Sequence, residues 1–214
     1  MADIGTDHGY LPIEAVVQGF CKRAIACDIR PGPLSVAEAN VRAAGLSDAI
    51  ETRLGDGLKP VLLGEADSIV MSGMGGTLMW KIITDSGGEK AKSAKRLILQ
   101  PQHDIEGLRK NLHSAGFEIV DESLVCDSRF YVILVACYTG AITKWTEKEY
   151  FLGKYIENNE YRQLYFNEMQ RKLVGYIHRI TDEKARKVAK NRYHWLEEEN
   201  EAVRKVKNLT LFQT

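Results

Sequence analysis

The sequence contains few cysteines and prolines, and neither sign of charge is in excess. Its four cysteines, Cys21, Cys27, Cys126 and Cys137, are widely spaced, and it has no Cys-x-x-Cys pair and no cluster of cysteine with histidine. This pattern predicts neither a metal site nor a disulfide, as in a reducing cytosol. A signal peptide and an apolar run of 18 residues are also absent, which argues against a membrane protein and favours a soluble, cytoplasmic one.

Opposite charges balance over the whole chain but not along it. Lys+Arg and Asp+Glu number 29 each, so the protein is not polybasic overall. Residues 1–142 carry 14 basic and 18 acidic side chains, whereas residues 143–214 carry 15 and 11. The basic excess is concentrated between Arg171 and Arg192, where eight Lys or Arg accompany only two acidic residues. Such a stretch either attracts phosphate backbones or forms a solvated helix face, and charge alone does not decide between them.

Strand-length apolar runs alternate with helical patterns through about residue 140. Strands are predicted at residues 2–5, 24–28, 49–54, 67–72, 95–100, 117–126 and 130–138, and helices at 11–19, 33–45, 75–85 and 104–115. Strands separated by helices predict a parallel sheet, whereas only a turn at Asp127 and Ser128 separates the last two. A Rossmann-like α/β sheet, mostly parallel and ending in an antiparallel hairpin, is typical of class I methyltransferases.

The character of the chain changes after Thr143. From Glu147 to Leu209 there is no proline, and apolar residues recur at three- and four-residue steps. We expect two long helices with a break near Asp182, which would cap the second. The predicted domains are therefore a Rossmann-like domain at residues 1–142 and a helical, coiled-coil-like domain at residues 143–214. Because the first strand begins at Ala2, we also expect the N-terminus to be truncated.

Residues 3–9 read Asp-Ile-Gly-Thr-Asp-His-Gly, a strand end that runs into a glycine-rich turn. Such a turn marks a nucleotide-type cofactor site at the first crossover of a Rossmann-like sheet. A dinucleotide would place its pyrophosphate on the amides of this turn, where the carboxylate of Asp7 would repel it. S-adenosylmethionine has no phosphate and a positive sulfonium, so the acidic turn favours this cofactor. The predicted cofactor residues in the turn are Asp3, Gly5, Thr6, Asp7, His8 and Gly9.

Further site residues are expected at the ends of other strands, since ligands of parallel sheets bind at the carboxyl ends. Asp28 could accept both ribose hydroxyls of the cofactor, and Asp56 could accept a hydrogen bond from the adenine amino group. A loop of small residues follows the fourth strand, beside the expected entrance of a methyl acceptor. The predicted site residues in these stretches are Asp28 and Ile29 after the second strand, Gly55, Asp56 and Gly57 after the third, and Ser72, Gly73, Met74 and Gly75 after the fourth.

Other polar residues near the strand ends leave two interpretations open. Gln100, Gln102 and His103 follow the fifth strand and either extend the site or simply form a turn. Arg129, in the hairpin turn, either meets a phosphate or is an ordinary exposed arginine. No Asn-Pro-Pro-Tyr motif and no cysteine beside the cleft are present, which disfavours methylation of exocyclic amines and of pyrimidine carbons. A ring nitrogen or a hydroxyl is the remaining acceptor.

Together these motifs resemble the bacterial tRNA (adenine-22-N1)-methyltransferase family. The resemblance rests on Ala2–Pro12, Gly55–Leu58, Ser72–Gly76 and Leu97–Pro101, and a helical C-terminal extension is also expected of that family. It implies methyl transfer from S-adenosylmethionine to N1 of an adenine, position 22, in tRNA. Asp7 would then face the base, Met74 and Gly75 would shape its pocket, and the family's helical stretch before the first strand is missing here.

Several alternatives remain open at the level of sequence. Asp7 could stabilise the cation formed by N1 methylation, or it could act as a base on the amino group. The acceptor could instead be a small molecule or a protein, or the chain could be a non-catalytic RNA-binding protein with a methyltransferase-like fold. The C-terminal helices could bind tRNA through the basic stretch and the cleft, or they could mediate dimerisation, so the oligomeric state is open.

Overall fold

A computed structural model describes residues 1–85, 88–142, 144–156 and 160–211, with side chains described as far as residue 201. The chain divides into two compact units. Met1–Glu122 and Tyr131–Lys144 form the first, here called the sheet unit. Ser123–Phe130 and Trp145–Thr214 form the second, here called the helical unit. Among the described residues, no helix is both long enough and apolar enough to cross a membrane.

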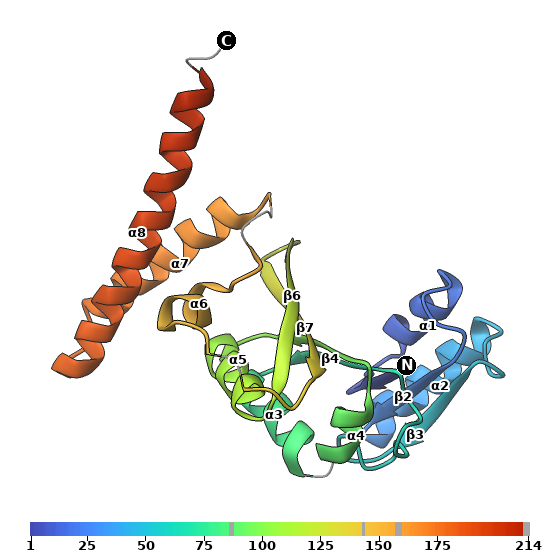
Figure 1. The fold of residues 1–214 in the computed structure, drawn as a ribbon. Helices are drawn as coiled ribbons and strands as arrows, with labels where there is room; N and C mark the ends of the chain where they lie inside the picture. Colours follow the sequence, from blue (N-terminus) through green and yellow to red (C-terminus); the bar gives the residue numbers. More distant parts are fainter. Residues whose placement is uncertain (86–87, 143, 157–159, 212–214) are drawn as a thin grey trace. The chain divides into compact units, whose positions relative to one another are not determined.

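One seven-stranded sheet organises the sheet unit (Figure 1). Its strands are β1 (Ala2–Ile4), β2 (Ala24–Asp28), β3 (Ile50–Leu54), β4 (Ser68–Met74), β5 (Arg96–Pro101), β6 (Phe117–Cys126) and β7 (Phe130–Tyr138). Their order is β3-β2-β1-β4-β5-β7-β6; neighbours from β3 to β5 are parallel, and β7 runs antiparallel to β5. This confirms the predicted Rossmann-like sheet with a terminal hairpin.

The tip of the β6–β7 hairpin, residues 123–130, groups with the helical unit. The division proposed at residue 142 placed this tip in the first domain. The ring of Phe130 packs edge-on against Tyr165, with 5.7 Å between the ring centroids, which helps to explain why the tip belongs with the helices. Sequence pattern shows the two strands but not where their outer ends pack.

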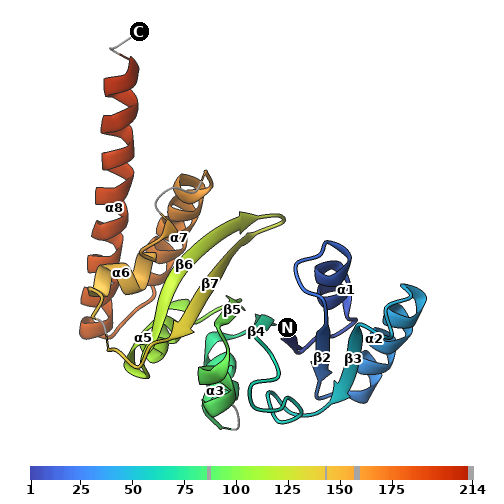
Figure 2. The ribbon, with the colours of Figure 1, turned by 45° about the vertical axis from the view of Figure 1, so that its right-hand side comes forward.

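Helices of the sheet unit lie in the connections from β1 to β2, from β2 to β3, from β4 to β5 and from β5 to β6 (Figure 2). They are α1 (Tyr10–Val17), α2 (Pro31–Ala43), α3 (Gly76–Asp85), α4 (Gly88–Ser93) and α5 (Ile105–Ser114). Proline at the start of α2 is compatible with the helix because the first helical N–H has no intrahelical acceptor. Gly116 follows α5 with a φ of +82°, a left-handed conformation that ends the helix. Only Ala91 of α4 is buried. The helix therefore shows no repeat of apolar residues from which it could have been predicted.

The central strands are buried on both faces, which fixes the position of their carboxyl ends. Every residue of β1 and β2 is buried. Ala24, Ala26 and Ile50 form a core cluster with Val41 of α2, and Ile13 of α1 packs against it. Polar residues that follow such strands are thereby held at one edge of the sheet.

Three helices form most of the helical unit: α6 (Glu147–Leu152), α7 (Arg162–Ile177) and α8 (Glu183–Leu211). The two predicted long helices are α7 and α8, and the chain breaks between them near Asp182 as expected, but the short helix α6 before them was not predicted. Thr146 and Glu149 form a capping box at its start, and Gly153 ends it with a φ of +93°. The predicted cap of α8 is confirmed, since Asp182 Oδ1 accepts a hydrogen bond from the Ala185 amide at 2.7 Å.

The two long helices share an apolar core and a cluster of amides. Phe166 of α7 and Leu196 of α8 are buried together with Leu152 of α6. Asn200, only 8% exposed, donates to Asn167 Oδ1 at 3.2 Å and to Gln170 Oε1 at 3.1 Å. Buried amides between helices favour one alignment, because a shifted helix would leave them unpaired.

A buried ion pair joins α5 to β6. Arg109 Nε donates to Glu122 Oε1 at 2.7 Å, and the two side chains are 1% and 0% exposed. Removing one partner of a buried ion pair lowers the stability of the fold, because water cannot reach the remaining charge to solvate it.

We predict that Glu122→Gln lowers the free energy of unfolding by about 3 kcal/mol, since it removes the negative charge from a fully buried ion pair with Arg109. Urea denaturation would measure the change. The matched control is Glu38→Gln, which breaks the exposed pair between Glu38 and Arg42 and should cost no more than about 0.5 kcal/mol. Equal effects of the two substitutions would contradict the prediction.

Candidate functional site

A cavity of about 750 Å³ opens at the carboxyl ends of β1 to β4. Its volume lies within the usual range for a cofactor or small ligand. It is lined by Ile4, Gly5, Asp7, Asp28, Ile29, Arg30, Gly55, Asp56, Gly57, Ser72, Gly73, Met74, Leu78 and Ile82. The structure thus brings together most of the predicted site residues, although they come from four separate strand ends.

The remaining predicted residues lie next to the cavity without lining it. Asp3 and Thr6 are buried, at 3% and 7% exposure. His8 and Gly9 follow Asp7 at the start of α1. The His103 ring lies over the Cα of Gly75, where a Cβ would collide with it.

Four lining residues were not predicted: Ile4, Arg30, Leu78 and Ile82. Leu78 and Ile82 are one turn apart on α3, and that spacing could have indicated an apolar wall. Arg30 stands two residues after Asp28, but nothing in the pattern shows that its side chain turns back over the site.

The turn after β1 is fixed by the end of β2. The amides of Gly5 and Thr6 both donate to the carbonyl oxygen of Cys27, each at 2.8 Å. Gly5 has a φ of +77°, and a Cβ at this position would collide with the terminal methyl of Met74. The left-handed backbone favours glycine here, whereas the flexible end of the Met74 side chain could move away from a Cβ.

Asp28 also holds this turn. Its Oδ2 accepts from the Asp7 amide at 3.1 Å, and its Oδ1 accepts from the Arg30 amide at 2.8 Å. The Asp28 side chain is only 4% exposed. Asp7 has a φ of +53°, which is uncommon outside glycine and is easiest for Asn and Asp. The hydrogen bond from its amide thus holds Asp7 in a conformation with a local cost.

The carboxylate of Asp7 lies between two partners. His8 Nδ1 is 3.0 Å from its Oδ2, and Arg30 Nη2 is 3.6 Å from its Oδ1. Arg30 Nε is also 3.6 Å from Asp28 Oδ1, so one guanidinium faces two carboxylates. Asp7 remains 55% exposed and is accessible to a reacting group.

Asp56 presents a third carboxylate to the cavity. Lys59 Nζ lies 2.6 Å from Asp56 Oδ2, and the hydrogen bond from Lys59 lowers the pKa of Asp56 below its ordinary value. Asp56 is therefore an ionised acceptor at neutral pH. Nearby, a Cβ on Gly57 would come within 2.9 Å of the Ile82 side chain, so glycine allows α3 to approach this loop.

The loop after β4 is supported by the segment after β5. Gln100 Oε1 accepts from Ser72 Oγ and from the Gly73 amide, both at 3.1 Å. The Gln102 amide donates to Met74 O at 2.8 Å, and the Gly76 amide donates to His103 O at 2.9 Å. Residues 100–103 thus position the loop rather than line the cavity. Arg129 lies in the hairpin turn of the helical unit and is not among the lining residues.

Two buried groups beneath the turn have raised pKa values. The pKa of Asp3 is raised to about 6, mainly because the carboxyl is buried; the Thr6 hydroxyl partly offsets this rise, and the negative charge of Asp28 adds to it. Burial also raises the pKa of the Cys27 thiol to about 12. Both groups therefore favour their protonated forms more than exposed groups of the same type.

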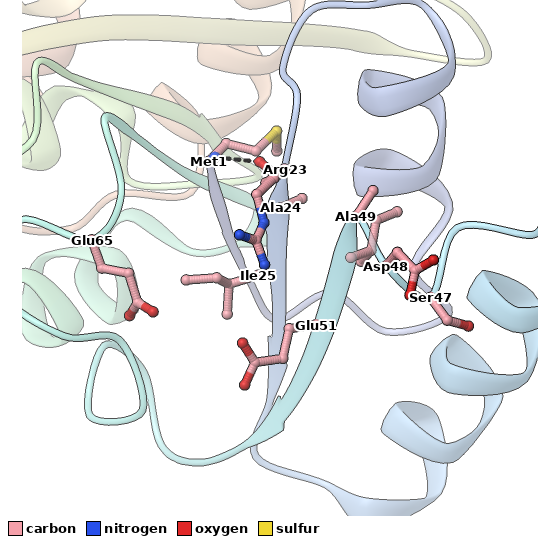
Figure 3. A pocket seen from close by; sticks show the side chains of 10 residues that line it. Met1, Arg23, Ala24, Ile25, Ser47, Asp48, Ala49, Glu51 and Glu65 are labelled. Atoms are coloured by element: carbon pink, nitrogen blue, oxygen red, sulfur yellow. Dashed lines mark hydrogen bonds between the residues drawn. The ribbon is translucent and has the colours of Figure 1, made fainter.

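A second cavity, of about 380 Å³, lies at the opposite, amino-terminal ends of β1 to β3 (Figure 3). The Met1 ammonium donates to Arg23 O there at 2.9 Å. The charged side chains of Arg23, Asp48, Glu51 and Glu65 contribute to its lining. In parallel sheets this end is not where ligands usually bind, so the first cavity is the candidate site.

Among the residues that the structure describes, no three His, Cys, Asp or Glu side chains are grouped closely enough to hold a metal ion.

The strand order, the reversed β7 and the cavity at the strand ends define a Rossmann-like methyltransferase fold. The sequence model of one family, tRNA (adenine(22)-N(1))-methyltransferase, or TrmK, matches residues 1–208. The chain belongs to this family.

Individual relatives agree with this assignment. The tRNA (adenine(22)-N(1))-methyltransferase of Bacillus subtilis strain 168 is 41% identical over 137 residues. That alignment covers 64% of this chain but only 57% of the Bacillus protein, less than two thirds of its length. The crystal structure of B. subtilis TrmK, an m1A22 tRNA methyltransferase, superposes with a TM-score of 0.79 at 30% identity, covering 94% of this chain and 91% of that one.

A Streptococcus pneumoniae protein whose crystal structure was solved in complex with S-adenosyl-L-methionine is also similar. It superposes with a TM-score of 0.82 at 31% identity, and the match covers 93% of this chain and 91% of that chain.

The raised pKa of Asp3 leads to a prediction about stability and pH. Below about pH 4 the carboxyl is protonated in both folded and unfolded chains. Between about pH 4 and pH 6 the unfolded chain ionises this carboxyl while the folded protein keeps it protonated, so stability falls by about 2–3 kcal/mol and stays at the lower level above pH 6. We predict that Asp3→Asn removes this loss and raises the melting temperature at pH 7.

Thermal unfolding between pH 4 and pH 8 would test this prediction. The control is Asp67→Asn, because Asp67 is 75% exposed and paired only with an exposed lysine. A pH profile for Asp3→Asn that parallels the wild-type profile would contradict the assignment of this pH dependence to Asp3.

Proposed function

We propose that this chain transfers the methyl group of S-adenosylmethionine to N1 of adenine 22 in tRNA. The observation that carries the proposal is the cavity at the ends of β1 to β4, with the acidic, glycine-rich turn at its edge. The S-adenosylmethionine complex of the Streptococcus relative and the activity named for the Bacillus relative support it.

The lining fits this cofactor in charge and in shape. The lining contains three carboxylates (Asp7, Asp28 and Asp56) and one guanidinium, that of Arg30, so it carries a negative excess suited to a sulfonium. Ile29, Leu78 and Ile82 supply apolar surface for an adenine ring. A pyrophosphate would instead meet the Asp7 carboxylate within the turn, where dinucleotide sites require small residues.

Asp28 and Asp56 are the proposed anchors of the cofactor. Asp28 already accepts two amide hydrogen bonds, but a carboxylate has about four acceptor positions and can still receive ribose hydroxyls. Asp56, kept ionised by Lys59, is placed to accept from the adenine amino group. Gly5, Gly55 and Gly57 allow the ligand to approach the backbone closely.

When bound, the cofactor supplies an activated methyl group, so the residues of this chain need only orient the acceptor and balance charge. N1 of adenine becomes positive when it is methylated, and the exposed carboxylate of Asp7 would stabilise this developing charge. Alternatively, Asp7 would accept a proton from the amino group of the base. In either role His8 and Arg30 hold the carboxylate in place, while Met74 and Gly75 shape the entrance for the base.

We further propose that the basic stretch of the helical unit binds the tRNA backbone. Seven of its eight cations are exposed: Arg171, Lys172, Arg179, Lys184, Arg186, Lys187 and Lys190. In the described part of the chain, Lys172 is paired with Glu168, whereas Lys184, Arg186, Lys187 and Lys190 have no carboxylate partner. Such unpaired cations suit phosphate contacts. A cytoplasmic location, where tRNA is available, is part of the same proposal.

The proposal is tested by methyl transfer from labelled S-adenosylmethionine to unmodified tRNA, with nucleoside analysis of the product. We expect labelled 1-methyladenosine at position 22, and none with tRNA that carries guanosine there. Cofactor binding without any labelled tRNA would reject tRNA as the substrate and favour a small-molecule or protein acceptor.

Within this assay, Asp7→Asn separates catalysis from cofactor binding. Asparagine tolerates the left-handed backbone of Asp7 and keeps its shape, so only the charge is removed. We expect the rate of methyl transfer to fall by about 10²- to 10³-fold, while the Kd for S-adenosylmethionine, measured by calorimetry, changes less than about fivefold. Equal losses in rate and affinity would show that Asp7 acts through the cofactor.

The basic stretch is tested by the pair Lys187→Gln and Lys190→Gln, introduced together. We expect a higher KM for tRNA and an unchanged Kd for the cofactor. The slope of the logarithm of tRNA affinity against the logarithm of salt concentration should become shallower by about one for each lost phosphate contact. Lys22→Gln with Lys95→Gln is the matched control, because these exposed lysines precede β2 and β5 at the sheet edge opposite the cavity. A similar loss in both pairs would reject a specific tRNA surface on α7 and α8.

A further inference from the structure

We propose that the rings of His8 and Tyr10 form an aromatic shelf on which the target adenine stacks after it leaves the tRNA helix. This inference rests on the proposed function and assigns a place for the base, which the cofactor cavity alone does not provide.

The backbone that carries the shelf is firmly held. The carbonyl of His8 accepts a hydrogen bond from Asn40 Nδ2 of α2 at 2.9 Å. Gly9 donates to Thr6 O at 3.0 Å, and its Cα lies so close to α2 that a Cβ would come within 3.1 Å of Ala37. The segment is thus tied to β2 and α2 on one side, and its side chains project from a fixed base.

The two rings themselves are little used by the fold. Tyr10 is 68% exposed and the His8 side chain is 43% exposed, whereas Pro12 is the buried residue of α1. Their ring centroids are 6.0 Å apart and the planes are tilted by 51°. An exposed tyrosine on a rigid turn adds little to stability, but it offers a preformed flat surface to a ligand.

A chain of contacts leads from the cofactor cavity to this shelf. Asp7 lines the cavity, His8 Nδ1 lies 3.0 Å from Asp7 Oδ2, and the His8 ring adjoins Tyr10. His8 and Tyr10 do not line the cavity. The two rings therefore lie beside the exposed carboxylate of Asp7 and outside the cofactor cavity.

An extruded purine is the occupant that this arrangement suits. Proteins that recognise unpaired bases commonly stack them on tyrosine or histidine, and enzymes that act on a base remove it from the helix. Stacking on Tyr10 would also compensate for part of the lost stacking in the tRNA, while Asp7 stays next to the reacting edge. Tyr10 and His8 are then positioning residues for the acceptor and not for the cofactor.

The test compares Tyr10→Ala, Tyr10→Leu and Tyr10→Phe in methylation of tRNA. We expect Tyr10→Ala to lower kcat/KM for tRNA by about tenfold to a hundredfold, with the Kd for S-adenosylmethionine unchanged. Tyr10→Phe keeps the ring and should stay within about threefold of the wild type. Tyr10→Leu keeps apolar bulk without a π face and should resemble Tyr10→Ala. The matched control is Phe20→Ala, which removes an exposed aromatic ring beyond the end of α1.

A second readout does not depend on turnover. A 2-aminopurine at position 22 is quenched while it stacks within the tRNA, and stacking on the shelf should keep it quenched in the complex with the wild-type protein. Emission should be higher in the complex with Tyr10→Ala than in the complex with Tyr10→Phe.

Wild-type kinetics and wild-type quenching in Tyr10→Ala would overturn the shelf while leaving the proposed function intact. An equal loss in Phe20→Ala would also overturn it, because a general effect of removing aromatic rings would then explain the result. If the wild type does not methylate tRNA, the shelf and the proposed function fail together.

Discussion

The carboxyl end of β2 is the point on which the site depends. The carbonyl of Cys27 accepts two consecutive amides of the turn after β1, and the carboxylate of Asp28 accepts the amides of Asp7 and Arg30. Since β2 is buried along its whole length, these acceptors cannot move without disturbing the core. The turn, including the left-handed Asp7, is therefore preorganised by the sheet, and a ligand need not bear the free-energy cost of ordering it.

A second layer of support lies behind the loop after β4. Gln100 holds Ser72 and Gly73, and the backbone of residues 102 and 103 holds Met74 and Gly76. Met74 in turn covers the Cα of Gly5 across the sheet. The loops after β1, β4 and β5 thus form one connected wall, in which a change at one strand end is transmitted to the next through hydrogen bonds and packing.

The sequence was sufficient to predict the sheet and most of the cavity, because the information is local. Each central strand is an apolar run that ends in glycine or a carboxylate, and parallel pairing brings such ends together. Where the orientation of a side chain or loop depends on tertiary contacts, the sequence pattern gave a wrong prediction or none. The side chain of Arg30 turns back toward Asp7 and Asp28, and the segment at Gln100 supports the loop instead of lining the cavity. The short helices α4 and α6 offer too few apolar positions to show a period.

The thiol of Cys27 has a chemical consequence that follows from its burial. With a pKa of about 12, only about one molecule in 10⁵ carries a thiolate there at neutral pH. Alkylating reagents and oxidants attack the thiolate, so this cysteine is protected as long as β2 stays within the sheet. Cys21, Cys126 and Cys137 are only partly buried. Modification of Cys27 therefore reports the opening of the central sheet, and its rate measures how often the strand that anchors the site is exposed to solvent.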